Sequence, residues 1–412
     1  MHPVRVQAQA VRVVSSTWAR DSHDLFDFEA TDLHRKTFTA LKPAVCVRTG
    51  TDVQMLSDAL AAPRVNNMCD PLLRLAQKDG SFWVDRAPPQ GSSKKLWLVV
   101  RDMPNGAHHL QQGDVIKLGR FKFRVRQLEG TGEMQPELRL DDSGAVCRVN
   151  LDGEKELANT LCRICLLEGP SEGDPLIAPC LCKGSIEYVH LGCLRHWIRG
   201  RLNLSDSSGG SYFFRPLPCE LCKAAYPTYV QNEADPLQPM PLVEVPWTRP
   251  PFIVLENMVR DSQQHACRGL HVISLAEKVL KLGRGHESDV RIADVSISRC
   301  HAMIRFHQGH FQLEDNNSKF GTLVAMKKPR LLEPGQGVSI QMGRTVLSLS
   351  AQTDLEAADA PAPLRHGTSS GAADERQLRL ALLNRGSGGA RPDGWGTEYP
   401  GDAAQLPREA DE

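Results

Sequence analysis

The stretch "APCLCKGSIEYVHLGCLRHWI", residues 178–198, places three cysteines and a histidine in a segment that also has the pattern of a helix. Cys180 and Cys182 are separated by one residue. His190 and Cys193 have the spacing that one helical turn brings to the same side. Thiolates and imidazoles are ligands that zinc prefers in proteins. The stretch therefore predicts that metal helps to organise this part of the chain.

Further ligand-type residues lie on both sides of this stretch. The complete set has gaps of 2, 14, 1, 7, 2, 25 and 2 residues between successive members: Cys162, Cys165, Cys180, Cys182, His190, Cys193, Cys219 and Cys222. Eight such ligands suit two tetrahedral zinc ions whose positions are all filled, which predicts structural and not hydrolytic metal. Disulfides or a cluster without metal are the alternative, and such clustering in a long intracellular chain favours metal over them.

The composition limits the classes to which the protein belongs. Its 49 basic and 49 acidic residues give no electrostatic reason to expect a nucleic acid or a membrane surface as partner. The N-terminus lacks the apolar core of a secretory signal, and no apolar run approaches the ~18 residues of a membrane span. We therefore expect a soluble intracellular protein, cytoplasmic or nuclear. Five cysteines are scattered singly and are expected to be small buried apolar residues: Cys46, Cys69, Cys147, Cys267 and Cys300.

The 412 residues divide into five parts by pattern. Residues 1–140 mix polar stretches with runs typical of strands, and residues 159–226 hold the cysteine cluster. The Pro-rich residues 227–250 have the composition of an extended linker. Short alternating runs separated by turn residues predict an all-β sandwich or barrel over 251–352. The Ala-, Gly- and Pro-rich tail, 353–412, is predicted to be disordered.

Two segments of the chain are similar to one another. "LQQGDVIKLGRFKFRV" (110–125) and "LEPGQGVSIQMGRTVLSL" (332–349) share Leu, Gly, a hydrophobic pair and Gly-Arg before an alternating strand. A second, partial copy of one β module near the N-terminus would explain the similarity. A chance match of two hairpins would explain it as well, so both interpretations stay open.

The cysteine cluster resembles the RING-CH (variant RING) zinc finger of ubiquitin ligases over about 65 residues. A PHD finger has the same ligand order, but it usually carries a Trp two residues before the seventh ligand, where this chain has Leu217. Here Trp197 follows Cys193 by four residues, as in RING domains. The cross-brace of the family implies that one zinc takes Cys162, Cys165, His190 and Cys193. The other zinc would take Cys180, Cys182, Cys219 and Cys222.

The RING-CH resemblance implies a ubiquitin ligase without a nucleophile of its own. Such a ligase docks a ubiquitin-conjugating enzyme and orients its thioester-linked ubiquitin for attack by a lysine. The resemblance places the docking surface on Ile164 and Trp197, with Lys223 as a basic contact after the last ligand. Packing beneath the zinc loops is the alternative role for Trp197. Many RING-CH ligases are membrane proteins, but a Pro-rich stretch follows this finger, so a membrane role is not carried over.

Residues 250–352 resemble the forkhead-associated (FHA) domain, a β-sandwich that binds phosphothreonine through loops at one end. The signatures are Gly283-Arg284, Ser298-Arg299-Cys300-His301 and Ser318-Lys319-Phe320-Gly321-Thr322. The resemblance implies that Arg284 and Ser298 bind phosphate, because a guanidinium and a hydroxyl suit a dianion. Contributions are also expected from Arg299, Asn317 and Lys319, and His301 is expected to be structural. Phe320 stands where the family usually has Asn.

These expectations describe a multidomain protein: a small two-zinc cross-brace finger, an all-β FHA sandwich, a partly β N-terminal region and a disordered tail. The hypothesis is a ubiquitin ligase that recruits phosphorylated proteins, with ubiquitin and a conjugating enzyme as its other partners. One alternative is a phospho-dependent adaptor with a non-catalytic finger. Another is a ligase whose FHA-like part has lost its pocket and only packs or dimerises, which the substitution at Phe320 favours.

Overall fold

The computed structural model describes twelve segments of the chain, which contain mainly β-strands. These segments are residues 10–20, 24–57, 69–87, 95–131, 146–149, 157–202, 211–215, 217–232, 235–243, 247–258, 269–276 and 278–353. The tail was predicted to be disordered, and its residues after 353 lie outside the described segments. The described part includes the helix α2 (Leu191–Leu202), which follows His190 as the sequence predicts. No helix within the described segments has the length and apolar character needed to cross a membrane.

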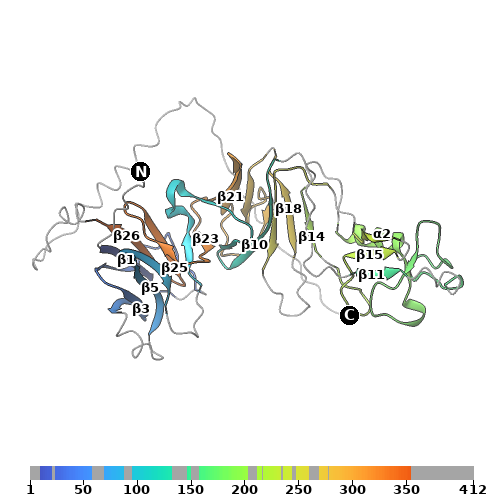
Figure 1. Ribbon diagram of the computed structural model, residues 1–412, viewed down its shortest axis with the longest axis horizontal. Helices are drawn as coiled ribbons and strands as arrows, with labels where there is room; N and C mark the ends of the chain where they lie inside the picture. The colour runs from blue at the N-terminus through green and yellow to red at the C-terminus, as the bar shows by residue number, and fades with distance from the viewer. Residues whose placement is uncertain are drawn as a thin grey trace, which may run out of the picture. The chain divides into compact units, whose positions relative to one another are not determined.

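One large sheet runs through both β regions of the chain (Figure 1). Its strands follow in this order: β14 (Tyr212–Phe214), β18 (Leu270–Ser274), β17 (Phe252–Asn257), β10 (Phe121–Glu129), β9 (Val115–Leu118), β23 (Thr322–Ala325), β7 (Trp97–Val99), β25 (Gly337–Met342), β26 (Thr345–Gln352), β1 (Ala10–Trp18) and β2 (Leu33–Ala40). Alternating side chains bury one face, as Phe123 and Val125 do in β10. Strands from residues 1–140 and 251–352 therefore belong to one sheet.

Two five-stranded sheets complete two separate cores. The first consists of β24 (Arg330–Leu331), β6 (Ser81–Arg86), β5 (Asp70–Lys78), β3 (Ala44–Thr49) and β4 (Asp52–Ser57). The second consists of β20 (Val290–Arg291), β19 (Leu280–Gly283), β21 (Ala302–His307), β22 (His310–Asp315) and β8 (Ala107–His109). With the large sheet they form what we call the N-terminal sandwich, which contains β1–β6, and the C-terminal sandwich, which contains β17–β22.

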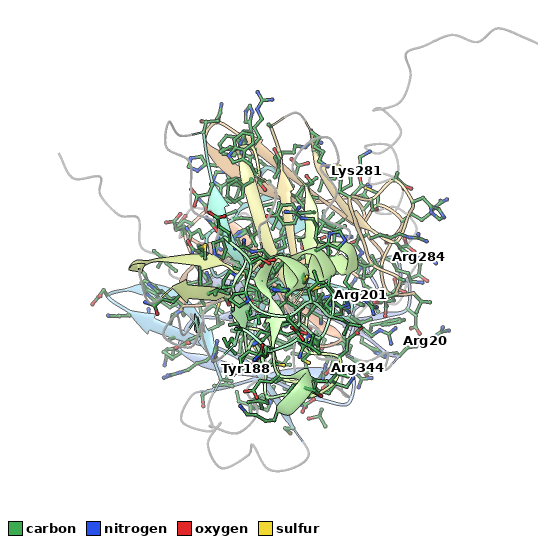
Figure 2. The ribbon with its side chains drawn as sticks, turned by 90° about the vertical axis from the view of Figure 1, so that its right-hand side faces the viewer. Arg20, Tyr188, Arg201, Lys281, Arg284 and Arg344 are labelled. Carbon is green, nitrogen blue, oxygen red and sulfur yellow. The ribbon has the colours of Figure 1, made fainter. Side chains whose placement is uncertain are left out.

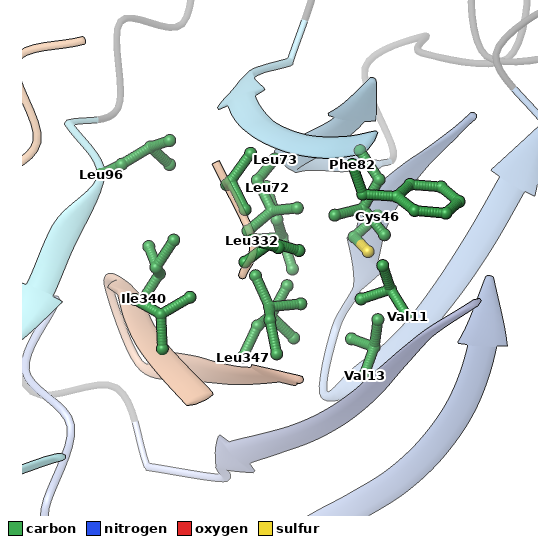
Figure 3. Packing of buried hydrophobic residues seen from close by; sticks show 14 of the residues in the cluster. Val11, Val13, Cys46, Leu72, Leu73, Phe82, Leu96, Leu332, Ile340 and Leu347 are labelled. Carbon is green, nitrogen blue, oxygen red and sulfur yellow. The ribbon is translucent and has the colours of Figure 1, made fainter. Parts of the chain in front are cut away.

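Each sandwich is closed by strands from the other half of the chain. In the N-terminal core, Val11 and Phe82 pack in one cluster with Ile340 and Leu347 (Figure 3). In the C-terminal core, residues of β9 and β10 such as Phe123 pack with residues of β17–β23. The pairing agrees, because β26 lies antiparallel to β1 and β10 lies antiparallel to β17. The hairpins β9–β10 and β25–β26 are therefore exchanged between the sandwiches.

The chain passes from one core to the other at two short segments. Leu98 lies in the N-terminal core and Val100 in the C-terminal core. Val324 lies in the C-terminal core and Met326 in the N-terminal core. Each crossing lies at the last residue of a strand of the large sheet, Val99 of β7 or Ala325 of β23, and these two strands pair with one another. The exchange is therefore made at the centre of the large sheet.

The shared Gly-Arg of the two similar sequences forms the turn of each exchanged hairpin. Arg120, after β9, donates to the Asp294 carboxylate at 2.8 Å in the C-terminal sandwich. Arg344, after β25, donates to the carbonyl oxygens of Ala19 and Gly50, both at 3.0 Å, in the N-terminal sandwich. Both Gly-Arg pairs therefore lie in the turn of an exchanged hairpin, and a second copy of one module stays a prediction.

The Pro-rich stretch is packed against the cysteine-rich region. This stretch contains β15 (Tyr229–Asn232) and β16 (Asp235–Pro241), which make a sheet with β11 (Val146–Val149). Val230 and Leu242 are buried in one cluster with residues of α2, and Arg195 of α2 donates to the carbonyl oxygen of Pro241 at 2.7 Å. The extended conformation that was predicted is present, but these residues do not act as a free spacer, because their apolar side chains join the core of the finger.

Candidate metal centres and phosphopeptide-binding loops

The eight predicted ligands form two groups of four. Within each group the ligand atoms all lie within 4.8 Å of one another: Cys162, Cys165, His190 and Cys193 in the first, and Cys180, Cys182, Cys219 and Cys222 in the second. These are the interleaved groups that the RING-CH resemblance implies. Two short strands, β12 (Leu176–Ile177) and β13 (Val189–His190), and the first turn of α2 bring the distant pairs together.

The first group has the polar surroundings of a metal site. The Sγ of Cys165 lies 3.3 Å from Nδ1 of His190. The other ring nitrogen, Nε2, lies 2.8 Å from the carbonyl oxygen of Gly169 and donates to it, which leaves Nδ1 free to act as a ligand. Backbone N–H groups of Ile164 and His190 each lie 3.4 Å from the Sγ of Cys162. This arrangement suits a thiolate and a neutral imidazole facing a cation.

One thiol in each group, Cys162 or Cys219, has a strongly lowered pKa, whereas burial and neighbouring thiols raise the pKa of Cys182 and of Cys193 to about 12. Burial alone would raise the pKa of Cys162, but the N–H groups around it outweigh that effect and lower the pKa to about 6. The pKa of Cys219 is likewise lowered to about 6 by the N–H groups of Cys222 and Leu221, against the opposing effect of burial. In the second group Arg163 also donates to the Sγ of Cys180 at 3.5 Å. Soft donors in two closed sets of four fit zinc.

The predicted docking residues differ in exposure. Ile164 lies on the turn between two ligands and is 41% exposed. Trp197, on α2, is half-buried: its ring packs edge-on against Tyr226 with 6.3 Å between centroids, and the Arg201 guanidinium lies 5.4 Å above it. Figure 2 shows Arg201 on this helix. Both a docking role and the alternative packing role therefore remain compatible with Trp197.

Sequence reasoning missed two apolar residues near the metal groups. Leu181 and Leu221 are 76% and 59% exposed, and each lies between two members of a ligand pair, as Ile164 does. That position between paired ligands, together with their apolar character, was the available signal. Lys223 is exposed, and its Nζ donates to the carbonyl oxygen of Glu220 at 2.8 Å.

Three loops of the C-terminal sandwich meet where the phosphate-binding residues were predicted. The backbone N–H of Arg284 donates to the carbonyl oxygen of Ser298 at 3.0 Å, and that of Lys319 donates to the Ser298 hydroxyl at 3.2 Å. The N–H of Gly285 donates to the carbonyl oxygen of Arg299 at 2.9 Å. The side chains of Arg284 (Figure 2), Arg299 and Lys319 are exposed. Three exposed basic residues and a serine therefore lie on loops that meet at one end of the sandwich.

His301 fastens these loops from inside. Its Nδ1 accepts the N–H of Ser298 at 3.1 Å, and its Nε2 donates to the carbonyl oxygen of Gly321 at 3.1 Å. The residue is fully buried, and burial lowers the pKa of His301, so the neutral ring makes both bonds. Asn317 is exposed with a φ of 49°. Its neighbour Asn316 donates to the carbonyl oxygen of Cys300 at 3.1 Å.

Phe320 packs in an apolar cluster with residues of the N-terminal half. Its half-buried ring lies 6.5 Å from that of Trp18, in an apolar cluster that also contains Phe26 and Leu323. An amide at this position would be left beside aromatic rings, so the phenyl group suits the contact with the N-terminal residues. The side chain that replaces the usual Asn thus belongs to the packing between the two parts of the β structure.

Comparison with known proteins gives matches to the same two parts of the chain. Residues 162–222 match the RING-variant domain family, and residues 280–344 match the FHA domain family. The E3 ubiquitin-protein ligase MARCHF7 of Rattus norvegicus is 39% identical over 72 residues, which cover 18% of this chain and 10% of the relative. MARCHF8 of Homo sapiens is 40% identical over 78 residues, which cover 19% and 21%.

A third relative, the probable E3 ubiquitin-protein ligase MARCHF10 of Homo sapiens, is 36% identical over 73 residues, 18% of this chain and 8% of the relative. The chain therefore spans about a tenth of the length of the MARCHF7 relatives it matches. The likeness lies in the zinc-finger region. This chain carries a RING-variant domain related to that of the MARCHF ubiquitin ligases, together with an FHA domain.

Proposed function

We propose that this chain is a RING-type ubiquitin ligase that docks a ubiquitin-conjugating enzyme and acts on proteins recruited by their phosphothreonine. The observation that carries the proposal is the pair of four-ligand groups, which hold Ile164, Leu181 and Leu221 exposed on their loops. Two zinc ions, one in each group, would supply structure and no reactive group, because four protein ligands fill each position. The apolar residues would contact the conjugating enzyme, and orientation of its ubiquitin would supply the rate.

The FHA loops support the recruitment half of the proposal. The exposed side chains of Arg284, Arg299 and Lys319 belong to loops that meet at Ser298, and basic side chains with a hydroxyl suit the charge and the oxygens of a phosphate dianion. Because the loops and the finger belong to one chain, a bound substrate would be held near the charged conjugating enzyme at a raised effective concentration. An adaptor without ligase activity is the competing proposal, and it shares the phosphopeptide site.

We expect Ile164→Ala to abolish most ubiquitin transfer while the chain keeps its metal. The side chain is 41% exposed, so its loss removes contact area without opening a core. Loss of a docking anchor typically costs about 2 kcal/mol or more, which corresponds to about 30-fold weaker binding. Transfer should be measured with several conjugating enzymes, beside the zinc content. Leu41→Ala is the matched control, because Leu41 is 66% exposed but lies outside the finger.

Undiminished transfer by Ile164→Ala with every conjugating enzyme would reject docking through this residue. Trp197→Ala is a second variant of the predicted surface, and it is expected to keep two zincs and lose transfer. Its half-buried ring makes Ile164 the cleaner substitution. If the unmodified chain transfers no ubiquitin with any enzyme but binds phosphopeptides, the adaptor replaces the ligase.

We expect Arg284→Ala to weaken phosphothreonine-peptide binding by about tenfold to a hundredfold, because a charge-assisted hydrogen bond contributes about 1.5–3 kcal/mol. The peptides should come from a degenerate phosphothreonine library, with the unphosphorylated library beside it. Arg305→Ala is the matched control, since Arg305 is exposed in β21 and pairs with Glu314 at 3.2 Å. Equal binding of both libraries by the unmodified chain would reject phosphate recognition.

A further inference from the structure

The loop that carries Asn317, Lys319 and Phe320 is fixed by a buried carboxylate at its start. The side chain of Asp315 is 0% exposed. Its Oδ1 accepts the hydroxyls of Ser318 at 2.5 Å and Thr322 at 2.6 Å. This one carboxylate therefore ties both ends of residues 316–321 together.

The counter-charge of Asp315 comes from the N-terminal half of the chain. Nη2 of Arg101 lies 2.7 Å from Oδ2 of Asp315 and donates to the carbonyl oxygen of Ser318 at 2.5 Å. Arg101 lies in a short 3-10 helix, Val100–Asp102, directly after β7, where the chain crosses between the two cores. The crossing of the chain between the two cores thus places a cation against the buried side of the predicted phosphopeptide loop.

Phe28, also from the N-terminal half, packs against both Arg101 and the loop. Its ring lies 4.2 Å from the Arg101 guanidinium carbon, and its N–H donates to the carbonyl oxygen of Lys319 at 2.9 Å. A Cβ on Gly321 would lie 2.6 Å from the Phe28 ring, so glycine is needed for this close approach. The preceding residue, Asp27, places Oδ2 3.4 Å from Nζ of Lys319.

From these contacts we infer that the phosphopeptide site is a composite of both halves of the chain. In it, Arg101 is a positioning residue for loop 316–321, and Phe28 packs against both Arg101 and this loop. The inference rests on the proposed phosphopeptide binding. As a positioning residue, Arg101 would act on the ligand through Asp315 and Ser318. A loop that is ordered before binding loses less conformational entropy when a peptide arrives, so Arg101 contributes to affinity from beneath the site. The contacts of Phe28 do the same from the side of Lys319.

The composite site also accounts for the aromatic side chain at residue 320. In this chain the loop is held by Arg101 and Phe28, and Phe320 packs on Trp18 of β1. Residues of the N-terminal half therefore make contacts with this loop that residues 280–344 would otherwise have to make. It follows that the FHA loops need residues well outside 280–344 to bind their ligand.

The test is Arg101→Met in the full chain, with two readouts. Hydrogen exchange of the amides in residues 316–322 should become at least about tenfold faster, since an unpaired Asp315 would destabilise the loop. Binding of a phosphothreonine peptide selected with the unmodified chain should weaken about tenfold. Arg101→Lys keeps the charge but has a shorter side chain and lacks the planar guanidinium that faces the Phe28 ring. Its readouts should therefore lie between those of Arg101→Met and those of the unmodified chain. Arg305→Met, which removes an exposed ion pair of the same sandwich, should change neither readout.

Unchanged exchange at residues 316–322 in both Arg101 variants would overturn the inference. Faster exchange throughout the C-terminal sandwich in Arg101→Met would be a general loss of stability, and Arg101→Lys then decides by whether its effect is confined to this loop. If the unmodified chain binds no phosphothreonine peptide, the proposed recruitment function fails. In that case the exchange rates still decide whether Arg101 positions the loop.

Discussion

Cys219→Ser will lower the zinc content of the chain and unfold the RING-variant domain, while both sandwiches stay folded. Cys219 is one of four donors whose ligand atoms lie within 4.8 Å of one another, and a serine hydroxyl is a poor replacement for a thiolate. Structural zinc contributes on the order of 10–16 kcal/mol in small zinc-finger peptides. The apolar cluster of this domain is small and includes Cys162 itself, so it cannot replace that contribution.

The measurement is zinc per chain by elemental analysis, together with hydrogen exchange mapped along the sequence. We expect two zinc ions in the unmodified chain, at most one in Cys219→Ser, and rapid exchange across α2. Cys69→Ser is the matched control, because this half-buried thiol lies 3.2 Å from the Thr49 hydroxyl and away from both groups. Two retained zinc ions in Cys219→Ser, or none in the unmodified chain, would contradict the assignment.

The sequence was a good guide to the ligand groups because their chemistry is local. Each ligand pair spans three or four residues, and the pairs at 162, 180, 190 and 219 have few other uses. The FHA signatures are local in the same way, because Arg284, Ser298 and Lys319 lie in loops that turn residues mark in the sequence. Their part in binding phosphate stays a prediction. In both cases residue type and short spacing carry the information, and the fold only has to bring a few segments together.

The lone cysteines show a mixed outcome. Cys46 is fully buried as expected, and burial raises its pKa to about 12. Cys69 and Cys300 are only half-buried. Cys267 lies outside the described residues, and the expectation for the side chain of Cys147 stays a prediction. A thiol can be tolerated at such intermediate positions because it is small, so composition alone does not determine its burial.

The exchange of hairpins could not be predicted from the sequence, because two hairpins with the same pattern compete for the same place in each sandwich. The hairpins at 115–129 and 337–352 have the same alternating pattern, so either could close either sandwich. A further signal was present: "CDPLLRLAQKDGSFWVDR" (69–86) and "CHAMIRFHQGHFQLED" (300–315) are similar and form β5–β6 and β21–β22. Two copies of one module would explain both similarities. The similarities do not say which copy supplies each last hairpin.

Two substitutions will test the exchange of hairpins, because each should destabilise the sandwich formed mainly by the other half of the chain. Phe123 lies outside the FHA match but is 1% exposed in the C-terminal core, and Phe123→Ala should lower the free energy of unfolding by about 3–5 kcal/mol. Ile340 lies within the match but is 0% exposed in the N-terminal core, and Ile340→Ala should cost about 2–5 kcal/mol. Hydrogen exchange should quicken in β17–β22 for the first variant, and in β3 and β5 for the second.

The two variants are controls for one another, because each removes a buried side chain from an exchanged hairpin of the same protein. If each hairpin closed its own half, the pattern would reverse: Ile340→Ala would loosen β21 and β22, and Phe123→Ala would loosen β3 and β5. Phe123 belongs to the core of the C-terminal sandwich, which carries the phosphopeptide loops. Phe123→Ala should therefore weaken phosphopeptide binding more than Ile340→Ala does. A fragment of residues 251–352 lacks Arg101, Phe28 and Phe123. For that reason its failure to bind a phosphopeptide would say nothing about the site in the full chain.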